Sequence, residues 1–301
     1  MTEPNVIEVT GLCRSFGAHN HVLTGVDLCV QRGSVLGLLG RNGAGKTTLI
    51  QLLLGILRFR EGRIRVLDLD PSTSGPEIRA RVGYVSEQPV FYANERVSDF
   101  LRFVSSFYST WSTEEAERLG DWLKIPQGSR IRELSRGMRA KLALLVALAH
   151  QPRLLVLDEP SSGLDPIVRE EFLEAVVDLV AQGGRTVLFS SHLLEDLERV
   201  ADSVAILAAG QIRVSGKLEA LRDRVKEVRL YLSEDGVPEE LRSMPGVLQC
   251  RRVEGGVVLL VDAPNGALMS ALEDRVRPQE IEVTRTNLNQ LFRAYTADTE
   301  G

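Results

Sequence analysis

Apolar residues from the N-terminus to about Gly216 alternate between short continuous runs and helical spacing. The helical patterns include 48–54 and 140–150. Runs rich in Val, Ile and Leu predict strands at 6–10, 35–39, 82–85, 154–157, 186–189 and 204–207. Two of these runs, 35–39 and 154–157, are almost wholly apolar, which is typical of strands covered by helices on both faces. The alternation predicts an α/β layer structure with a largely parallel sheet.

From about residue 223 the pattern changes to that of a smaller mixed unit. It predicts, in order, a strand, a short helix, two strands, a helix and a strand, at 228–232, 239–243, 247–252, 257–261, 267–276 and 281–284. This order indicates a compact α+β module of ferredoxin-like type, followed by a last helix that contains Leu291 and Tyr295. No catalytic constellation occurs there, so we expect a regulatory or dimerising appendage. The chain is therefore expected to form two domains, residues 1–222 and 223–301.

Seven of the chain's 16 aromatic residues crowd into the stretch that follows the third predicted strand. Phe100, Phe103 and Phe107 lie at i, i+3 and i+7, and a second apolar series follows one position later, so the helix predicted here is apolar on two faces. One face is expected to pack in the core. The other face, with Phe91 and Tyr92 in the preceding loop, is either further core or a docking site for a partner.

Composition and charge exclude several classes of function. A net charge of -5 and a pI near 5.6 argue against a surface built for nucleic acid, so no nucleic-acid partner is expected. The longest apolar run, 142–149, is much shorter than the roughly 20 residues that a membrane span requires. The first residues carry no secretory signal. We therefore expect the chain in the cytoplasm.

The sequence GRNGAGKT, Gly40–Thr47, fits the phosphate-loop pattern GxxxxGK followed by Ser or Thr. It follows an apolar strand and precedes a helical pattern, which is the context that the pattern requires. Glycines let the backbone turn its amides toward phosphate oxygens, and the positive end of the helix dipole reinforces that attraction. Lys46 is expected to reach the β- and γ-phosphates, and Thr47 to offer its hydroxyl to Mg²⁺. The loop therefore predicts a site for a nucleoside triphosphate.

A second buried strand, in LLVLDE, delivers Asp158 and Glu159 side by side at its carboxyl end. Asp158 suits the outer shell of Mg²⁺, and Glu159 suits the general base that polarises the water attacking the γ-phosphate. Taken alone, the pair also fits a helix N-terminus that favours acidic residues, since Pro160 and Ser161 follow. Together with the phosphate loop, it indicates hydrolysis.

Further motifs occur between and after these two elements: Gln88, LSRGM at 134–138, SSGLD at 161–165 and His192. In this order they resemble the ATP-binding cassette of ABC transporters, over about residues 5–220. The resemblance implies a P-loop NTPase fold of the ABC type, with a small helical subdomain at about 89–137. It also implies an ATPase that uses ATP and Mg²⁺ and couples hydrolysis to transport across a membrane.

The resemblance implies a role for each matching residue. Phe16 matches the aromatic residue that stacks on adenine, although alone it also fits the core. Gln88 matches the glutamine that senses Mg²⁺ and the attacking water. His192 matches the switch histidine that contacts the γ-phosphate, although alone it fits a capping residue. Asp165 matches the aspartate of the loop that crosses between two subunits.

The expected site residues fall into four groups. Those expected to act in catalysis are Glu159, His192 and Gln88. Those expected to bind ATP within the chain are Phe16, Gly40, Arg41, Asn42, Gly43, Ala44, Gly45, Lys46, Thr47 and Thr48. Those expected to reach the ATP of an opposite subunit are Ser135, Arg136, Gly137 and Asp165. Those expected to hold Mg²⁺ are Thr47, Gln88 and Asp158.

The signature departs from the usual LSGGQ, because Arg136 and Met138 replace the second glycine and the glutamine. The variant LSRGM and the C-terminal LNQLFRAY resemble bacterial cassettes of ABC-2 type exporters, so the resemblance favours export. We hypothesise that Arg136 adds positive charge near the γ-phosphate across a subunit interface.

One phosphate loop and one signature per chain imply a head-to-tail dimer, which we expect to be a homodimer, with two ATP molecules at its interface. The resemblance further implies a separate integral membrane permease subunit that contacts the region from Gln88 to Trp111, and a peripheral location on the inner face of the cell membrane. A soluble ABC-type ATPase acting on ribosomes or DNA shares the nucleotide motifs, but such proteins usually carry two cassettes or long coiled-coil insertions. A GTPase switch is disfavoured because the sequence has no NKxD-type motif.

Overall fold

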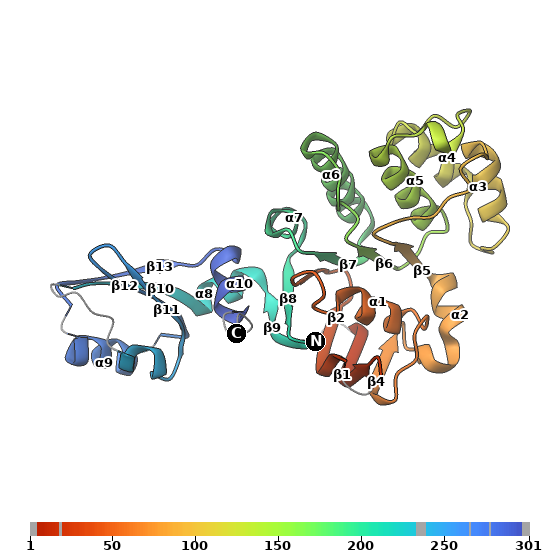
Figure 1. Cartoon of the computed structure of the whole chain (residues 1–301). Coiled ribbons are helices and arrows are strands. Elements are labelled where there is room, and N and C mark those ends of the chain that lie inside the picture. Colours follow the sequence, from red (N-terminus) through yellow and green to blue (C-terminus); the bar gives the residue numbers. More distant parts are fainter. Residues whose placement is uncertain (1–4, 18–19, 233–238, 265, 277, 297–301) are drawn as a thin grey trace. The chain divides into compact units, whose positions relative to one another are not determined.

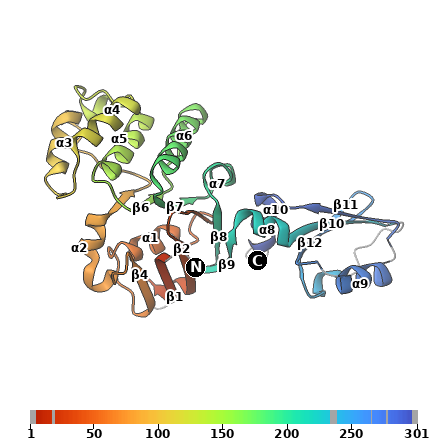
Figure 2. The same cartoon turned by 180° about the vertical axis from the view of Figure 1, so that it is seen from behind.

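The computed structural model describes residues 5–17, 20–232, 239–264, 266–276 and 278–296, and the chain divides into two compact units. They are Met1–Ile212 and Arg213–Gly301, so the boundary lies ten residues before the expected one at 222. The reason is the short helix α8 (Leu218–Arg224), which packs on β10 (Val225–Tyr231) and α10 (Leu288–Thr296) of the second unit. Figures 1 and 2 show the elements from two sides.

The first unit is built on five strands of a six-stranded sheet, whose last strand crosses the boundary between the units. Its strand order is β5 (Val82–Val85), β6 (Leu154–Asp158), β7 (Thr186–Ser191), β3 (Val35–Leu39), β8 (Ser203–Ala208) and β9 (Gln211–Lys217). The pairs from β5 through β8 are parallel. Every residue of β3, β6 and β7 is buried, as their continuous apolar runs predict. Because only β7 separates β3 from β6, the segments that follow these strands lie at the same edge of the sheet.

A second, antiparallel sheet of three strands completes the first unit. Its order is β2 (His21–Gln31), β1 (Asn5–Ser15) and β4 (Glu61–Val66). The strand predicted at 6–10 is confirmed as part of β1, but it belongs to this sheet and not to the parallel one. Ile7 and Leu28 from this sheet share one core with Leu38 of β3 and Ile50 of α1 (Lys46–Leu53). The core therefore holds the phosphate loop between the two sheets.

Helices cover the parallel sheet and form a separate group beside it (Figure 1). The helices that contact the strands include α1, α2 (Pro71–Arg81) and α7 (Leu194–Val200), and α6 (Pro166–Gly183) packs on α7 and on α5 (Arg136–Ala149), which itself contacts β5. The group consists of α3 (Val97–Ser105), α4 (Thr113–Trp122), the 3₁₀ turn η1 (Ile131–Glu133) and α5 (Arg136–Ala149). None of the helices in the described part of the chain is long and apolar enough to cross a membrane.

The helix predicted from the spacing of Phe100, Phe103 and Phe107 is shorter in the structure than expected. Helix α3 ends at Ser105, where the hydroxyls of Ser105 and Ser106 donate back to the carbonyls of Arg102 and Phe103. Such side-chain bonds compete with continuation of the helix. Phe107 therefore lies beyond the helix, which corrects its predicted place on it.

The second unit is a four-stranded antiparallel sheet in the order β11 (Val247–Val253), β12 (Gly256–Asp262), β10 and β13 (Glu280–Arg285). With η2 (Glu239–Ser243) and α9 (Gly266–Val276), its elements come in the predicted order, except that η2 is a 3₁₀ turn where a helix was expected. Val228, Leu259 and Leu272 lie in its core. Its assignment to the ferredoxin-like class stays a prediction.

The contact between β5 and α5 yields a test of the fold. A Cβ atom at Gly83 would lie 2.3 Å from the Ala147 carbonyl oxygen and 2.9 Å from the Leu155 side chain. Because backbone cannot easily move aside, we expect Gly83→Ala to lower the free energy of unfolding by about 2 kcal/mol. Thermal and denaturant unfolding measure this effect. At exposed Gly128, where an added Cβ meets nothing within 4 Å, the same substitution is expected to change stability little. Equal stability of the two variants would contradict the packing.

Candidate functional site

The phosphate loop connects β3 to α1 in a backbone path that needs glycine. Gly43 and Gly45 have φ values of 82° and 106°, in the left-handed region that other residues rarely adopt. A Cβ at Gly40 would lie 2.6 Å from the Leu207 carbonyl oxygen. Helix α1 begins directly after Gly45, at Lys46. The loop thus turns at the N-terminus of a helix, where backbone amides and the helix dipole attract anions.

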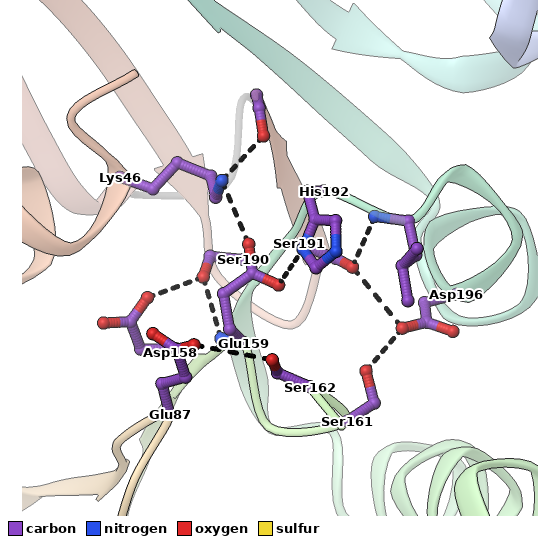
Figure 3. A network of polar contacts seen from close by, with 12 residues as sticks. Lys46, Glu87, Asp158, Glu159, Ser161, Ser162, Ser190, Ser191, His192 and Asp196 are labelled. Carbon is purple, nitrogen blue, oxygen red and sulfur yellow. Dashed lines mark hydrogen bonds and ion pairs between the residues drawn. The ribbon is translucent and has the colours of Figure 1, made fainter. Parts of the chain in front are cut away.

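Lys46 is a buried cation at the centre of the site, with 5% of its side chain exposed. Its Nζ donates to the carbonyl oxygens of Gly40 at 2.6 Å and Arg41 at 3.2 Å. The same Nζ lies 3.0 Å from Oε1 of Glu159, as Figure 3 shows. This contact is an ion pair without hydrogen-bond geometry, and Oε1 accepts no hydrogen bond from any described residue. The oxygen therefore keeps lone pairs that a proton can take.

Glu159 is held in place from two sides. Its Oε2 lies 2.7 Å from Nδ1 of His192, and its backbone amide donates to the Ser190 hydroxyl at 3.0 Å. The residue has a φ of 49°, which is uncommon for a side chain of this size. This conformation occurs directly after β6, where Glu159 leaves the strand. His192 follows the neighbouring strand β7, so the register of the two strands brings carboxylate and imidazole together.

Asp158 is buried beside them, at the last position of β6. Its Oδ1 accepts a hydrogen bond of 2.8 Å from the Ser190 hydroxyl. Burial raises the pKa of this carboxyl above its ordinary value. Hydrogen bonds from Ser190 and Thr47 lower the pKa, while the nearby carboxylates of Glu159 and Glu87 raise it further. A buried carboxylate among other carboxylates attracts a cation.

Mg²⁺ fits the oxygen atoms at this point. The hydroxyl of Thr47 and the carboxylates of Asp158 and Glu87 are hard ligands of the kind that this ion prefers. In the described residues no three His, Cys, Asp or Glu side chains form a metal cage by themselves. Mg²⁺ usually keeps several waters and takes phosphate oxygens as further ligands.

A cavity of about 620 Å³ opens over these residues. Nine residues expected at the site line it: Phe16, Asn42, Gly43, Gly45, Lys46, Thr47, Thr48, Glu159 and His192. Phe16 is not a core residue, because 42% of it is exposed, and the Arg14 guanidinium lies 4.5 Å from the centre of its ring. Gly40, Arg41 and Ala44 belong to the loop without lining the cavity. The structure thus brings most of the predicted ATP-binding residues together.

Gln88 does not line the cavity, whereas its neighbour Glu87 does. Gln88 is exposed, and the Ser162 hydroxyl donates to Oε1 of Glu87 at 3.4 Å. Glu87 therefore faces the site in this structure, whereas the expected role of Gln88 in catalysis and Mg²⁺ binding stays a prediction. Glu87 was not among the expected site residues, and neither was Ser162, although it lies in the SSGLD motif.

The signature residues lie outside this cavity. Ser135 caps α5, since its hydroxyl accepts from the Met138 amide at 3.2 Å. A Cβ at Gly137 would lie 2.1 Å from Cγ1 of Val168, so a side chain there would displace Val168 where α5 meets α6. The Arg136 guanidinium lies against Gly163 of the same chain. Asp165 likewise lies outside the cavity and caps α6 through the Val168 amide at 3.1 Å.

A buried network supports the segment that carries His192, and sequence analysis did not predict it (Figure 3). Asp196 is fully buried, accepts from the Ser161 hydroxyl and the Arg169 Nε at 2.5 Å each, and accepts from the Ser191 hydroxyl at 3.4 Å. The Ser191 hydroxyl in turn accepts from the Leu193 amide at 2.9 Å. The network ties the segments after β6 and β7 to each other and to α6.

Comparisons with known proteins agree on one family. Residues 23–162 match the family model described as ABC transporter. The chain is 30% identical over 294 residues to the uncharacterized ABC transporter ATP-binding protein YhaQ of Bacillus subtilis (strain 168), covering 95% of this chain and 97% of that protein. It is 30% identical over 305 residues to the daunorubicin resistance ATP-binding protein DrrA3 of Streptomyces coeruleorubidus, covering 97% and 96%. A solved structure of the ATP-binding subunit of an ABC transporter matches with a TM-score of 0.65 and 31% identity, over 72% of this chain and 92% of that one.

The raised pKa of Asp158 predicts a dependence of stability on pH. The folded state binds the Asp158 proton more tightly than the unfolded state, so the stability of the nucleotide-free protein falls as pH rises through the range between the ordinary and raised pKa values. Asp158→Asn removes the buried charge. We expect its melting temperature to exceed that of the parent at pH 7 to 8, with the difference shrinking as pH falls. Exposed Asp121→Asn serves as the control. A difference that stays constant with pH would contradict the assigned cause.

Proposed function

Because the chain belongs to the family of ABC transporter ATP-binding proteins, we propose that it powers an ABC-2 type exporter as an ATP-driven dimer bound to a separate membrane subunit. Proteins of this family bind and hydrolyse ATP. The single observation that carries the proposal is the placement of the Glu159 carboxylate between Lys46 and His192, at 3.0 and 2.7 Å. In this arrangement Lys46 can bind a triphosphate, and Glu159 can take a proton from water.

In the proposed mechanism ATP first competes for Lys46. Without nucleotide, the ammonium group pairs with the Glu159 carboxylate and donates hydrogen bonds to two carbonyls of the loop. The β- and γ-phosphates carry more negative charge than one carboxylate, so they draw Lys46 toward themselves and leave Oε1 of Glu159 without its cation. The freed oxygen then accepts a proton from water.

Hydrolysis follows as an in-line displacement. Glu159 takes a proton from the water as its oxygen attacks the γ-phosphorus, and the bond from that phosphorus to the oxygen bridging it to the β-phosphate breaks. His192, 2.7 Å from Glu159, fixes the carboxylate and offers its other nitrogen to the γ-phosphate. Mg²⁺, held by Thr47, Asp158 and Glu87, would neutralise phosphate charge when bound.

The dimer supplies what one chain lacks. Ser135 and Gly137 lie outside the cavity that Lys46 lines, so within one chain they do not contact the same triphosphate. A head-to-tail arrangement of two copies brings the signature of each over the phosphate loop of the other. In this arrangement Arg136 and Asp165, both exposed, face the second subunit. Binding of two ATP molecules closes the dimer, and release of phosphate opens it.

An exposed aromatic patch supports docking to the membrane subunit. Val90, Tyr92, Phe103 and Phe107 are 94%, 61%, 48% and 66% exposed. The aromatic rings contact one another edge to face, with centroids 5.8 Å apart for Tyr92 and Phe103 and 5.0 Å apart for Phe103 and Phe107. Adjacent exposed aromatic residues are typical of a partner site. The patch begins three residues after Glu87, so the segment that lines the nucleotide cavity continues directly into it.

Export and location rest on sequence similarity. The chain aligns along 96% of the daunorubicin resistance protein DrrA3. Its LSRGM signature and its C-terminal LNQLFRAY resemble those of ABC-2 type exporter cassettes. We place the dimer in the cytoplasm, on the inner face of the cell membrane, where the exported substrate is collected by the membrane subunit.

Replacing the proposed base tests the chemistry. Glu159→Gln is expected to keep ATP binding while lowering the ATPase rate by about 100-fold or more, because the amide cannot accept the proton of water. It should also trap an ATP-bound dimer, visible by size-exclusion chromatography. The matched control is Glu114→Gln, which neutralises an exposed glutamate in α4. Near-normal turnover of the Glu159 variant would refute the assignment.

Removing the aromatic patch tests the partner. In the double variant Phe103→Ser/Phe107→Ser we expect loss of co-purification with an integral membrane protein, while the ATPase activity of the isolated protein is retained. Val283→Ser removes a similarly exposed apolar side chain from the second unit and serves as the control. Recovery of the parent chain with ribosomes and without a membrane protein would instead favour the soluble ATPase class.

A further inference from the structure

A second cavity, of about 830 Å³, lies at the opposite ends of the strands that lead to the ATP site. We propose that it binds a small anion carrying two or more phosphate groups, as a site separate from the ATP site and beyond the proposed function. Two residues that line the cavity, Arg153 and Arg185, directly precede β6 and β7, respectively. Asp158 lies five residues after Arg153, at about 3.3 Å per residue, so roughly 16 Å of strand separates the two sites.

Positive charge dominates the cavity lining. Four arginines line it, Arg32, Arg81, Arg153 and Arg185, against a single carboxylate, that of Asp68. This concentration occurs in a chain whose net charge is -5. A guanidinium group matches phosphate oxygens with two parallel hydrogen bonds, so several of them around one cavity suit a ligand with more than one phosphate.

The arginines are only partly neutralised by the protein. Arg81 pairs with Glu77, and Arg185 lies 4.0 Å from Glu115. Glu115 also accepts two hydrogen bonds of 2.8 Å from Arg118, so its charge is already partly neutralised and it neutralises Arg185 less. Arg32 and Arg153 have no ion-pair partner within the ranges that the structure describes. At least two of the four positive charges therefore lack a counter-ion.

His150 provides an independent indication of a ligand. The residue lines the cavity and is 1% exposed, yet neither of its ring nitrogens has a hydrogen-bond partner among the described residues. Buried polar groups in folded proteins are nearly always paired. The ring is fixed by stacking on Tyr108, at 4.2 Å between centroids and 13° between planes. Burial lowers the pKa of His150 to about 4, so near neutral pH it is an uncharged imidazole with one N–H to donate.

The carboxyl end of α5 does not oppose an anion here. This end is the negative pole of the helix dipole, but its last carbonyl groups are already bonded. The Leu148 carbonyl accepts from the Gln151 amide at 2.8 Å, the Ala149 carbonyl from the Ser112 amide at 2.9 Å, and the His150 carbonyl from the Thr110 hydroxyl at 2.9 Å. The size of the cavity is within the range of small-molecule sites, which favours a compact ligand over an extended macromolecule.

Titration calorimetry with inorganic pyrophosphate tests the site. Saturating Mg²⁺–ADP is present throughout, so that the phosphate loop is occupied. The parent chain is expected to bind one pyrophosphate. The variant Arg153→Ala/Arg185→Ala is expected to bind it with an affinity at least about tenfold lower. The control, Arg63→Ala/Arg65→Ala, removes two exposed arginines of β4 and should bind as the parent does. ADP affinity, measured for every variant, confirms that the ATP site is folded.

A single substitution then tests the role of the buried imidazole. His150→Phe keeps an aromatic ring against Tyr108 but removes both nitrogens, so pyrophosphate affinity should fall while ADP affinity is unchanged. No pyrophosphate binding by the parent, or equal affinity of the parent and Arg153→Ala/Arg185→Ala, would overturn the proposal.

The source of the phosphate is distinguished by a flotation assay with vesicles containing cardiolipin, a lipid whose headgroup carries two phosphate groups. If the parent binds pyrophosphate but does not float, the ligand is a soluble phosphate compound. If it floats and Arg153→Ala/Arg185→Ala does not, the ligand is a lipid headgroup. Flotation of both proteins, without a difference in pyrophosphate affinity, would contradict the site.

Discussion

The structure of this ATPase depends on one buried ion pair, between Lys46 of the phosphate loop and Glu159 at the end of β6. Two charges out of water are tolerated only when neighbouring groups satisfy them, and here the carbonyls of Gly40 and Arg41 and the imidazole of His192 do so. The strand order β6, β7, β3 makes this possible, because it brings three segments, distant in sequence, to one edge of the sheet. The pair is also temporary in the mechanism, since a triphosphate provides a stronger partner for Lys46.

The residues that we propose complete a partner's site also hold this chain together. Ser135 and Asp165 cap α5 and α6, and Gly137 allows the close approach of α6 through Val168. A change at these positions therefore affects both local packing and the proposed interface. The Asp196 network also connects two segments. It supports the segment of His192 through Ser191, and through Ser161 it supports the start of the loop that leads to Asp165. The same hydrogen bonds therefore stabilise the fold and position the residues that we propose act on ATP.

Sequence patterns predicted the parts of the fold in which one physical effect dominates. Fully buried parallel strands must be continuous apolar runs, so β3, β6 and β7 were predicted within two residues of their ends. Strands β2 and β4 were not predicted, because each is buried on one face only and glycine interrupts its pattern. The glycine loop and Glu159 could be predicted from local chemistry. Which of Glu87 and Gln88 faces the site could not be predicted, since this depends on the direction in which a loop leaves β5. The end of α3 at Ser105 could not be predicted either.

Complementation between two inactive chains tests the division of the ATP site most directly. Lys46→Ala disables the phosphate loop, and Ser135→Asp places a negative charge where the γ-phosphate is expected while keeping a capping residue for α5. Each variant alone should lack ATPase activity. A mixed dimer has one site with both lesions and one with none, so mixing the two proteins is predicted to restore activity. No activity in a mixture shown to contain the mixed dimer would contradict a site shared between two copies of the chain.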